Sequence, residues 1–218
     1  MNLPLPLRVV FVSQGGEYKD AVQKRLGRAT REGMLANVLD IDYFVGDIRD
    51  VKRRKCGSTF FVSPGNSMGF MDGGIDLVYS RCMFPGIERK LRSIIRRVSP
   101  YRTAGGEAYL PIGSAIAVVI DDDLDLQRGN NVIVAAPTMF RPNDVSNTRN
   151  AYHAFRAVLD CIDVFYRKHS SSGIDHVTIV CPALCCGYGR MSYDESAPSI
   201  ERFRRDHTRR RRISHYRR

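Results

Sequence analysis

Short hydrophobic runs alternate along this chain with longer amphipathic segments, a pattern that indicates an α/β protein. Runs of four to eight apolar residues rich in valine, isoleucine and phenylalanine are typical of strands that are buried on both faces of a sheet. Such runs occupy residues 7–13, 38–45, 59–62, 114–120, 131–136 and 176–181. We therefore expect a layered sheet in which neighbouring parallel strands are joined by right-handed crossovers.

The segments between these runs predict helices. One follows the first strand over 17–30, and another covers 75–97 with an interruption at Pro85-Gly86. The clearest helix begins after a cap at Ser146 or Asn147, because its apolar residues recur at three- and four-residue steps. Those residues are Ala151, Phe155, Val158, Leu159, Ile162 and Phe165.

The end of the ordered chain carries its own helix signal. Ser192 and Glu195 have the spacing of a capping box, which predicts a final helix that runs to about Arg204. Open α/β sheets bind ligands beyond the carboxyl ends of their strands. The glycine-rich loops of this sequence follow predicted strands, so we expect them to form the binding site.

The charge of the chain is unevenly distributed. Its formal net charge is +11, but residues 202–218 alone contain nine arginines and one aspartate, which leaves +3 for residues 1–201. We therefore expect one domain over 1–203 and a disordered basic tail over 204–218. The tail has three interpretations: a nonspecific nucleic-acid contact, a nuclear address, or a solvated segment that aids solubility.

Composition narrows the class of protein. A hydrophobic content of 43% with 26% charged residues is ordinary for a globular domain. The N-terminus lacks the basic and apolar regions of a signal peptide, so we expect an intracellular protein, cytoplasmic or nuclear, with no membrane partner. The six cysteines lack zinc-binding spacing, so neither a metal nor a cofactor is expected.

Two glycine-rich segments suit a ligand that carries a diphosphate. Gly73-Gly74 immediately precedes a predicted helix, and Gly187-Tyr188-Gly189-Arg190 precedes the final one. Backbone N–H groups at such positions can face an anion. Glycines before helices are also common in tight turns, so neither segment alone indicates a phosphate site. The two segments together support one.

Three polar residues have both a binding and a structural interpretation. Asn66 can recognise a ribose through its carboxamide, or it can stabilise its own loop. Asp47 can accept a hydrogen bond from the exocyclic amine of a base while Ile48 packs near the ring, or it can cap the segment that begins at Ile48. Asp76 can act as a general base, or it can be a carboxylate at a helix start.

Taken in order, these segments resemble the macro domain family. The resemblance rests on Gly46-Asp47-Ile48, on Val62-Ser63-Pro64-Gly65-Asn66, on Gly73-Gly74-Ile75-Asp76 and on Gly187-Tyr188-Gly189-Arg190-Met191. The phage- and virus-associated branch is most similar, since Ala136-Pro137-Thr138-Met139 and the segment 105–111 also match it.

The resemblance implies a three-layer α/β/α fold with a mixed, mostly parallel sheet of six or seven strands and ADP-ribose at the strand ends. Asp47 and Ile48 would bind the adenine and Asn66 the distal ribose. Gly73, Gly74 and Ile75 would form one phosphate loop, and Cys186, Gly187, Tyr188, Gly189 and Arg190 the other. The implied partners are free ADP-ribose and mono-ADP-ribosylated proteins.

Enzymatic members of the family imply catalytic roles for Asn66 and Asp76, either as a mono-ADP-ribosyl hydrolase or as an ADP-ribose 1″-phosphatase with the same pocket. Two departures bear on catalysis. The usual Asn-Ala-Ala-Asn is here Ser63-Pro64-Gly65-Asn66, and the second loop is shorter than the common form. Binding can rely on backbone contacts, whereas a misplacement of ~1 Å can cost about 100-fold in rate.

Overall fold

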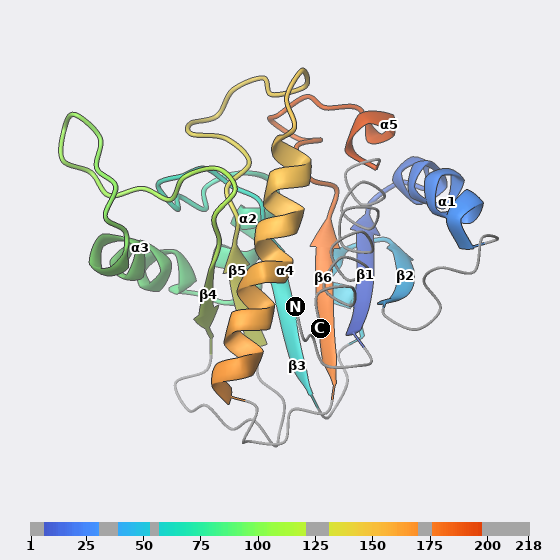
Figure 1. The fold of residues 1–218 in the computed structure, drawn as a ribbon, viewed down its shortest axis with the longest axis horizontal. Coiled ribbons are helices and arrows are strands. Elements are labelled where there is room, and N and C mark those ends of the chain that lie inside the picture. Colours follow the sequence, from blue (N-terminus) through green and yellow to red (C-terminus); the bar gives the residue numbers. More distant parts are fainter. Residues whose placement is uncertain (1–6, 31–38, 53–56, 121–130, 170–175, 198–218) are drawn as a thin grey trace, which may run out of the picture.

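The computed structural model describes residues 7–30, 39–52, 57–120, 131–169 and 176–197 (Figure 1). The basic tail over 204–218 and the predicted helical residues 198–204 lie outside these ranges. None of the helices in the described ranges is both long and apolar enough to cross a membrane.

A six-stranded mixed sheet forms the centre of the molecule, with strand order β2-β1-β6-β3-β5-β4. Its strands are β1 (Leu7–Ser13), β2 (Leu39–Val45), β3 (Ser58–Ser63), β4 (Ile116–Val119), β5 (Asn131–Ala135) and β6 (Val177–Pro182). Every pair is parallel except β4 with β5. The expected α/β class with a mostly parallel sheet is therefore confirmed.

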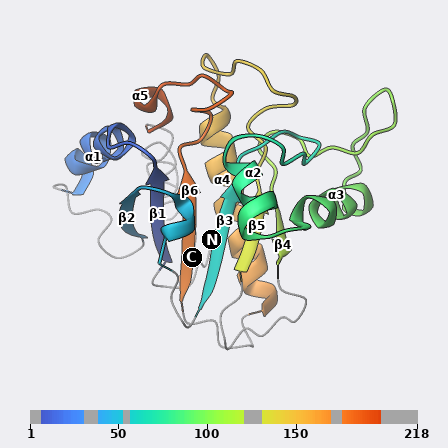
Figure 2. The ribbon, with the colours of Figure 1, turned by 180° about the vertical axis from the view of Figure 1, so that it is seen from behind.

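Helices cover both faces of this sheet. They are α1 (Glu17–Thr30), the 3-10 helix η1 (Ile48–Asp50), α2 (Gly74–Leu77), the π-helix η2 (Val78–Met83), α3 (Ile87–Val98), α4 (Asn150–His169) and α5 (Tyr193–Ser196). Figure 1 shows α4 across one face, and Figure 2 shows α2 and α3 on the other. The molecule thus has three layers, α/β/α.

Alternation along each strand divides the core into two. In β1, Val9 and Phe11 pack in a cluster with residues of α1 and α4, whereas Val10 and Val12 pack with residues of η2 and α3. All four side chains are buried, which is why the strand reads as a continuous apolar run.

The predicted start of one helix requires correction. The helix expected after Ser146 or Asn147 begins only at Asn150. The side chain of Asp144 accepts hydrogen bonds from the N–H and the hydroxyl of Ser146. Ser146 therefore belongs to a turn before the helix and does not cap it. Further on, the capping box at Ser192 and Glu195 is present and starts α5.

The strand ends matter most for function. The parallel strands β1, β2, β3, β5 and β6 all direct their carboxyl ends to one edge of the sheet, which is the upper edge in Figure 1. The loops that follow these strands therefore meet there, as the position of ligand sites in open α/β sheets predicts.

Candidate functional site

A cleft of about 630 Å³ lies at this edge, between the loops that follow the parallel strands. Its volume is in the range of small-molecule sites, which is about 300–1,000 Å³. Residues from five separate strand ends line it, so no single loop could form it. Every predicted site residue except Arg190 is among them: Asp47, Ile48, Asn66, Gly73, Gly74, Ile75, Asp76, Cys186, Gly187, Tyr188 and Gly189.

The carboxamide of Asn66 holds the first loop together. Its Nδ2 donates to the carbonyl of Phe70 at 3.0 Å, and its Oδ1 accepts from the N–H groups of Met68 at 3.1 Å and Phe70 at 3.3 Å. The loop-stabilising interpretation of Asn66 therefore describes its contacts in this structure. The residue still borders the cleft, so the same contacts fix the rim beside it.

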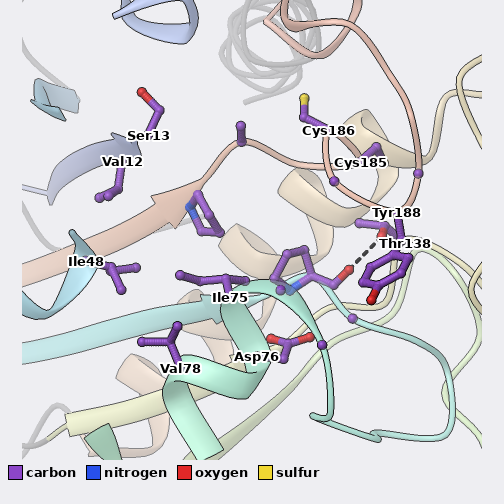
Figure 3. A pocket seen from close by; sticks show the side chains of 18 of the residues that line it. Val12, Ser13, Ile48, Ile75, Asp76, Val78, Thr138, Cys185, Cys186 and Tyr188 are labelled. Atoms are coloured by element: carbon purple, nitrogen blue, oxygen red, sulfur yellow. Dashed lines mark hydrogen bonds between the residues drawn. The ribbon is translucent and has the colours of Figure 1, made fainter. Parts of the chain in front are cut away.

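Two hydrogen bonds from Thr138 attach the first loop to the loop after β5. The hydroxyl of Thr138 donates to the carbonyl of Pro64 at 2.6 Å, which is the dashed line in Figure 3. The N–H of Thr138 donates to the carbonyl of Gly65 at 3.1 Å. These bonds join segments that are distant in sequence, which makes this wall of the cleft rigid.

Asp76 is the buried carboxyl group of the site. It is 5% exposed, and a Cβ at Gly65 would lie 2.3 Å from its Oδ2. Burial raises the pKa of Asp76 to about 7, an effect that a hydrogen bond with Ser63 opposes and the charge of Asp72 increases. Among the described residues, nothing donates to its buried Oδ1. A carboxyl with such a pKa is close to half-protonated at neutral pH.

The Gly73-Gly74 segment begins a helix, as its sequence predicts. Gly73 is the N-cap of α2, and α2 continues directly into the π-helix η2. Gly74 has φ +55, a left-handed conformation that favours glycine. The first N–H groups of a helix lack partners within it, and both Gly74 and Ile75 line the cleft.

The second loop is held in shape by its own backbone. The N–H of Arg190 donates to the carbonyl of Gly187, and that of Met191 donates to the carbonyl of Cys185, both at 3.0 Å. A Cβ at Gly189 would lie 2.5 Å from the Cys185 carbonyl oxygen, so this position requires glycine. These two bonds use the N–H groups of Arg190 and Met191 and not those at the tip of the loop.

The two glycine loops touch each other through Tyr188. A Cβ at Gly73 would be 2.9 Å from the Tyr188 ring, so the ring packs directly on the Gly73 backbone. Tyr188 is 67% exposed. Figure 3 shows it at the end of the cleft where Asp76 and Thr138 also lie. The predicted convergence of the two loops is therefore present.

Arg190 lies next to the cleft and not in its lining. It lines an open hollow with Asn143 and Asp144, and this hollow shares Gly74, Pro142, Gly187 and Tyr188 with the cleft. The role of Arg190 in ligand binding stays a prediction.

Asp47 lies at the opposite end of the cleft. Its carboxylate accepts hydrogen bonds from the N–H of Arg49 at 2.9 Å, from Nε at 2.9 Å and from Nη2 at 2.6 Å. These contacts lower the pKa of Asp47 to about 2. The carboxylate caps η1, as one of its two interpretations predicts. The next residue, Ile48, is buried.

Sequence reasoning missed two groups of residues here. Arg49 was overlooked, although a basic residue two positions after a capping aspartate is a readable signal. The apolar walls were also missed, because they come from strand ends and helices far apart in sequence. They include Val12, Val78, Met139, Pro142 and Pro182.

Two cysteines, Cys185 and Cys186, line the cleft. Burial raises the pKa of Cys185 to about 12 and that of Cys186 to about 11, so both thiols stay protonated near neutral pH. The described ranges contain no group of three or more histidine, cysteine or acidic side chains arranged to hold a metal ion.

Comparison with models of known protein families finds no match for this sequence. Comparison with curated proteins finds no similar sequence either. The geometry of the cleft therefore carries the functional conclusion.

Proposed function

We propose that this protein binds ADP-ribose in the cleft at the strand ends, either free or attached to a mono-ADP-ribosylated protein. The observation that carries the proposal is the meeting of the two glycine loops, in which the Tyr188 ring packs on Gly73. Backbone N–H groups from Gly74, Ile75 and the tip of the second loop then border the same part of the cleft. Paired loops of this kind suit a diphosphate, because they offer donors without introducing a charged side chain.

The end of the cleft near Asp47 suits the adenine ring. Val12, Ile48, Ile75 and Val78 form apolar walls there (Figure 3). Arg49 donates three hydrogen bonds to the Asp47 carboxylate. Two carboxylate oxygens have about four acceptor sites, so one remains for an exocyclic amine.

The site favours binding over hydrolysis. Asn66 uses its carboxamide within its own loop, and Asp76 is almost fully buried. A general base must reach the water or hydroxyl from which it takes a proton. The family's catalytic roles for these two side chains would require both to reorient, whereas the backbone donors need no rearrangement.

Calorimetric titration with ADP-ribose tests the proposal, and Gly187 offers a matched pair of variants. No atom lies within 4 Å of a Cβ at this position, so a side chain fits without disturbing the loop. We expect Gly187→Glu to weaken ADP-ribose binding roughly tenfold or more through repulsion of the diphosphate. Gly187→Gln, which has the same shape without the charge, should retain most of the affinity. Equal affinities for the two variants would argue against a diphosphate at this loop.

The enzymatic alternatives have separate assays. A hydrolase would release ADP-ribose from a mono-ADP-ribosylated protein and lose this activity in Asp76→Asn and Asn66→Ala. A phosphatase would release phosphate from ADP-ribose 1″-phosphate. The proposed binding protein retains the modified substrate and releases neither product.

A further inference from the structure

Positive charge in the body of the protein is concentrated in one segment. Residues 81–109 contain seven lysines and arginines against two acidic residues, a net charge of +5. Residues 1–201 as a whole carry +3, so the remainder of that range is net negative. The segment comprises α3 and the hairpin-like loop that follows it, at the far end of the sheet from α1 (Figure 1).

The arginines of α3 follow one side of the helix. Arg89, Arg92 and Arg96 are three and four residues apart, which places them in a row on the helix surface. Arg92 and Arg96 line a hollow of about 270 Å³, which Arg102 and the turn over 105–108 complete. Three guanidinium groups face the carboxylate of Glu107 in the hollow, and the carboxylate of Glu88 lies 3.9 Å from Arg92. The net positive charge that remains makes this hollow a place for an anion.

Two of these arginines are held in position. The guanidinium of Arg92 stacks on the Phe70 ring, 3.7 Å from its centroid. Arg102 donates to the carbonyls of Ser99 at 2.5 Å and Arg96 at 3.2 Å, which fixes the hairpin to the end of α3. The hollow is therefore preorganised, unlike a set of mobile surface side chains.

Exposed aromatic rings lie on the other face of the same hairpin. Arg102 pairs with Ala108 across it, so the flanking residues Tyr101 and Tyr109 share the opposite face. Their ring centroids are 5.8 Å apart, and Tyr109 packs on Phe140 at 5.2 Å. Tyr101 is 50% exposed and Phe140 is 42% exposed. These rings offer flat faces on the side of the hairpin opposite to Arg102.

We propose that α3 and this hairpin bind single-stranded nucleic acid, with phosphates along the arginine row and in the hollow and with bases stacked on Tyr101 and Phe140. Proteins hold single strands by combining cationic side chains for the backbone with exposed aromatic rings for the bases, and a strand that follows the arginine row and crosses the hairpin would meet both. An acidic polypeptide would match the charges but would leave the rings unused. The surface is distinct from the cleft and does not depend on ADP-ribose binding.

Fluorescence anisotropy of the full-length chain with a short labelled oligothymidylate, at several sodium chloride concentrations, tests the cationic part. Arg89→Glu/Arg96→Glu is compared with Lys24→Glu/Arg25→Glu, which makes the same change in net charge on exposed residues of α1. We expect the α3 variant to bind about tenfold or more weakly, with a salt slope reduced by about 1.4, since each phosphate contact contributes about 0.7 for single strands. The α1 variant should stay within about twofold of wild type. Equal weakening in both variants, or no binding by the wild-type chain, would overturn the proposal.

The aromatic part has its own test. Tyr101→Ala should weaken oligothymidylate binding about fivefold or more, since base stacking on an aromatic ring is strong, while Tyr101→Phe retains the ring and the affinity. A duplex of the same length should bind more weakly than the single strand. Unchanged binding by Tyr101→Ala, or displacement of the strand by polyglutamate as effective as by unlabelled oligothymidylate, would contradict a surface for single strands.

Discussion

The wild-type protein is expected to lose stability as the pH rises from about 4 to about 7, and replacing Asp76 with asparagine is expected to remove this loss. Burial raises the pKa of this carboxyl to about 7, whereas an aspartate in the unfolded chain titrates near 4. The folded state therefore binds the proton more tightly than the unfolded state. The stability that this proton contributes is fully present below the pKa of Asp76 in the unfolded state. It is lost as the pH rises through the pKa of Asp76 in the folded state, by at most about 1.4 kcal/mol per pH unit.

Urea unfolding at pH 5 and pH 8 measures this effect. The free energy of unfolding of Asp76→Asn, relative to wild type, should increase by roughly 2–3 kcal/mol between the two pH values. Asp20→Asn makes the same chemical change at an exposed residue of α1, away from Asp76, and should follow the wild-type profile. Parallel profiles for wild type and Asp76→Asn would show that Asp76 is not the buried, proton-binding group described here.

Gly65→Ala is expected to destabilise the fold by about 1–3 kcal/mol, the usual cost of forcing extra atoms into a packed site. The added Cβ would lie 2.3 Å from Oδ2 of Asp76 and 3.4 Å from its Cγ. A buried aspartate has a short side chain and cannot move aside as a lysine could. The carboxyl, the loop, or both must shift.

A double-mutant cycle identifies the cause. Asp76→Ala removes the atoms in conflict, so Gly65→Ala should cost much less in that background than in the wild type. Gly16→Ala serves as the control, because no atom lies within 4 Å of a Cβ there. Additive losses in free energy of unfolding would mean that Gly65 is required for a reason other than its contact with Asp76.

Both predictions concern the surroundings of one buried carboxyl. Ser63 hydrogen-bonds the carboxyl of Asp76, and Gly65 leaves space for it. These two residues of the first loop therefore accommodate the same buried side chain.

The central strands were readable from the sequence because they are buried on both faces. Val9 and Phe11 face one core and Val10 and Val12 the other, which produces an unbroken apolar run. The cleft was readable for a related reason, since loops after parallel strands must meet at one edge of the sheet. All but one of the proposed site residues accordingly line it.

The details that sequence did not reveal depend on contacts between distant segments. Tyr188 packs on Gly73, and Thr138 bonds to Pro64, yet neither pair has a local signal. The start of α4 at Asn150 was misplaced because serine is a common helix cap, so Ser146 suggested an earlier start. In the structure, Ser146 instead donates hydrogen bonds to Asp144 in a turn. For Asn66 both roles fit the sequence, and only the loop geometry shows where its hydrogen bonds go.

The most direct test of ADP-ribose binding in the cleft is to follow the backbone amide resonances of the full-length chain by NMR during titration with ADP-ribose. We predict saturable shifts of the Gly74, Ile75, Gly187 and Gly189 amides, since these groups border the proposed diphosphate position. The amides of Lys24 and Arg25 on the surface of α1 should not move. Unchanged Gly74 and Gly187 resonances at saturating ADP-ribose would contradict the proposed site.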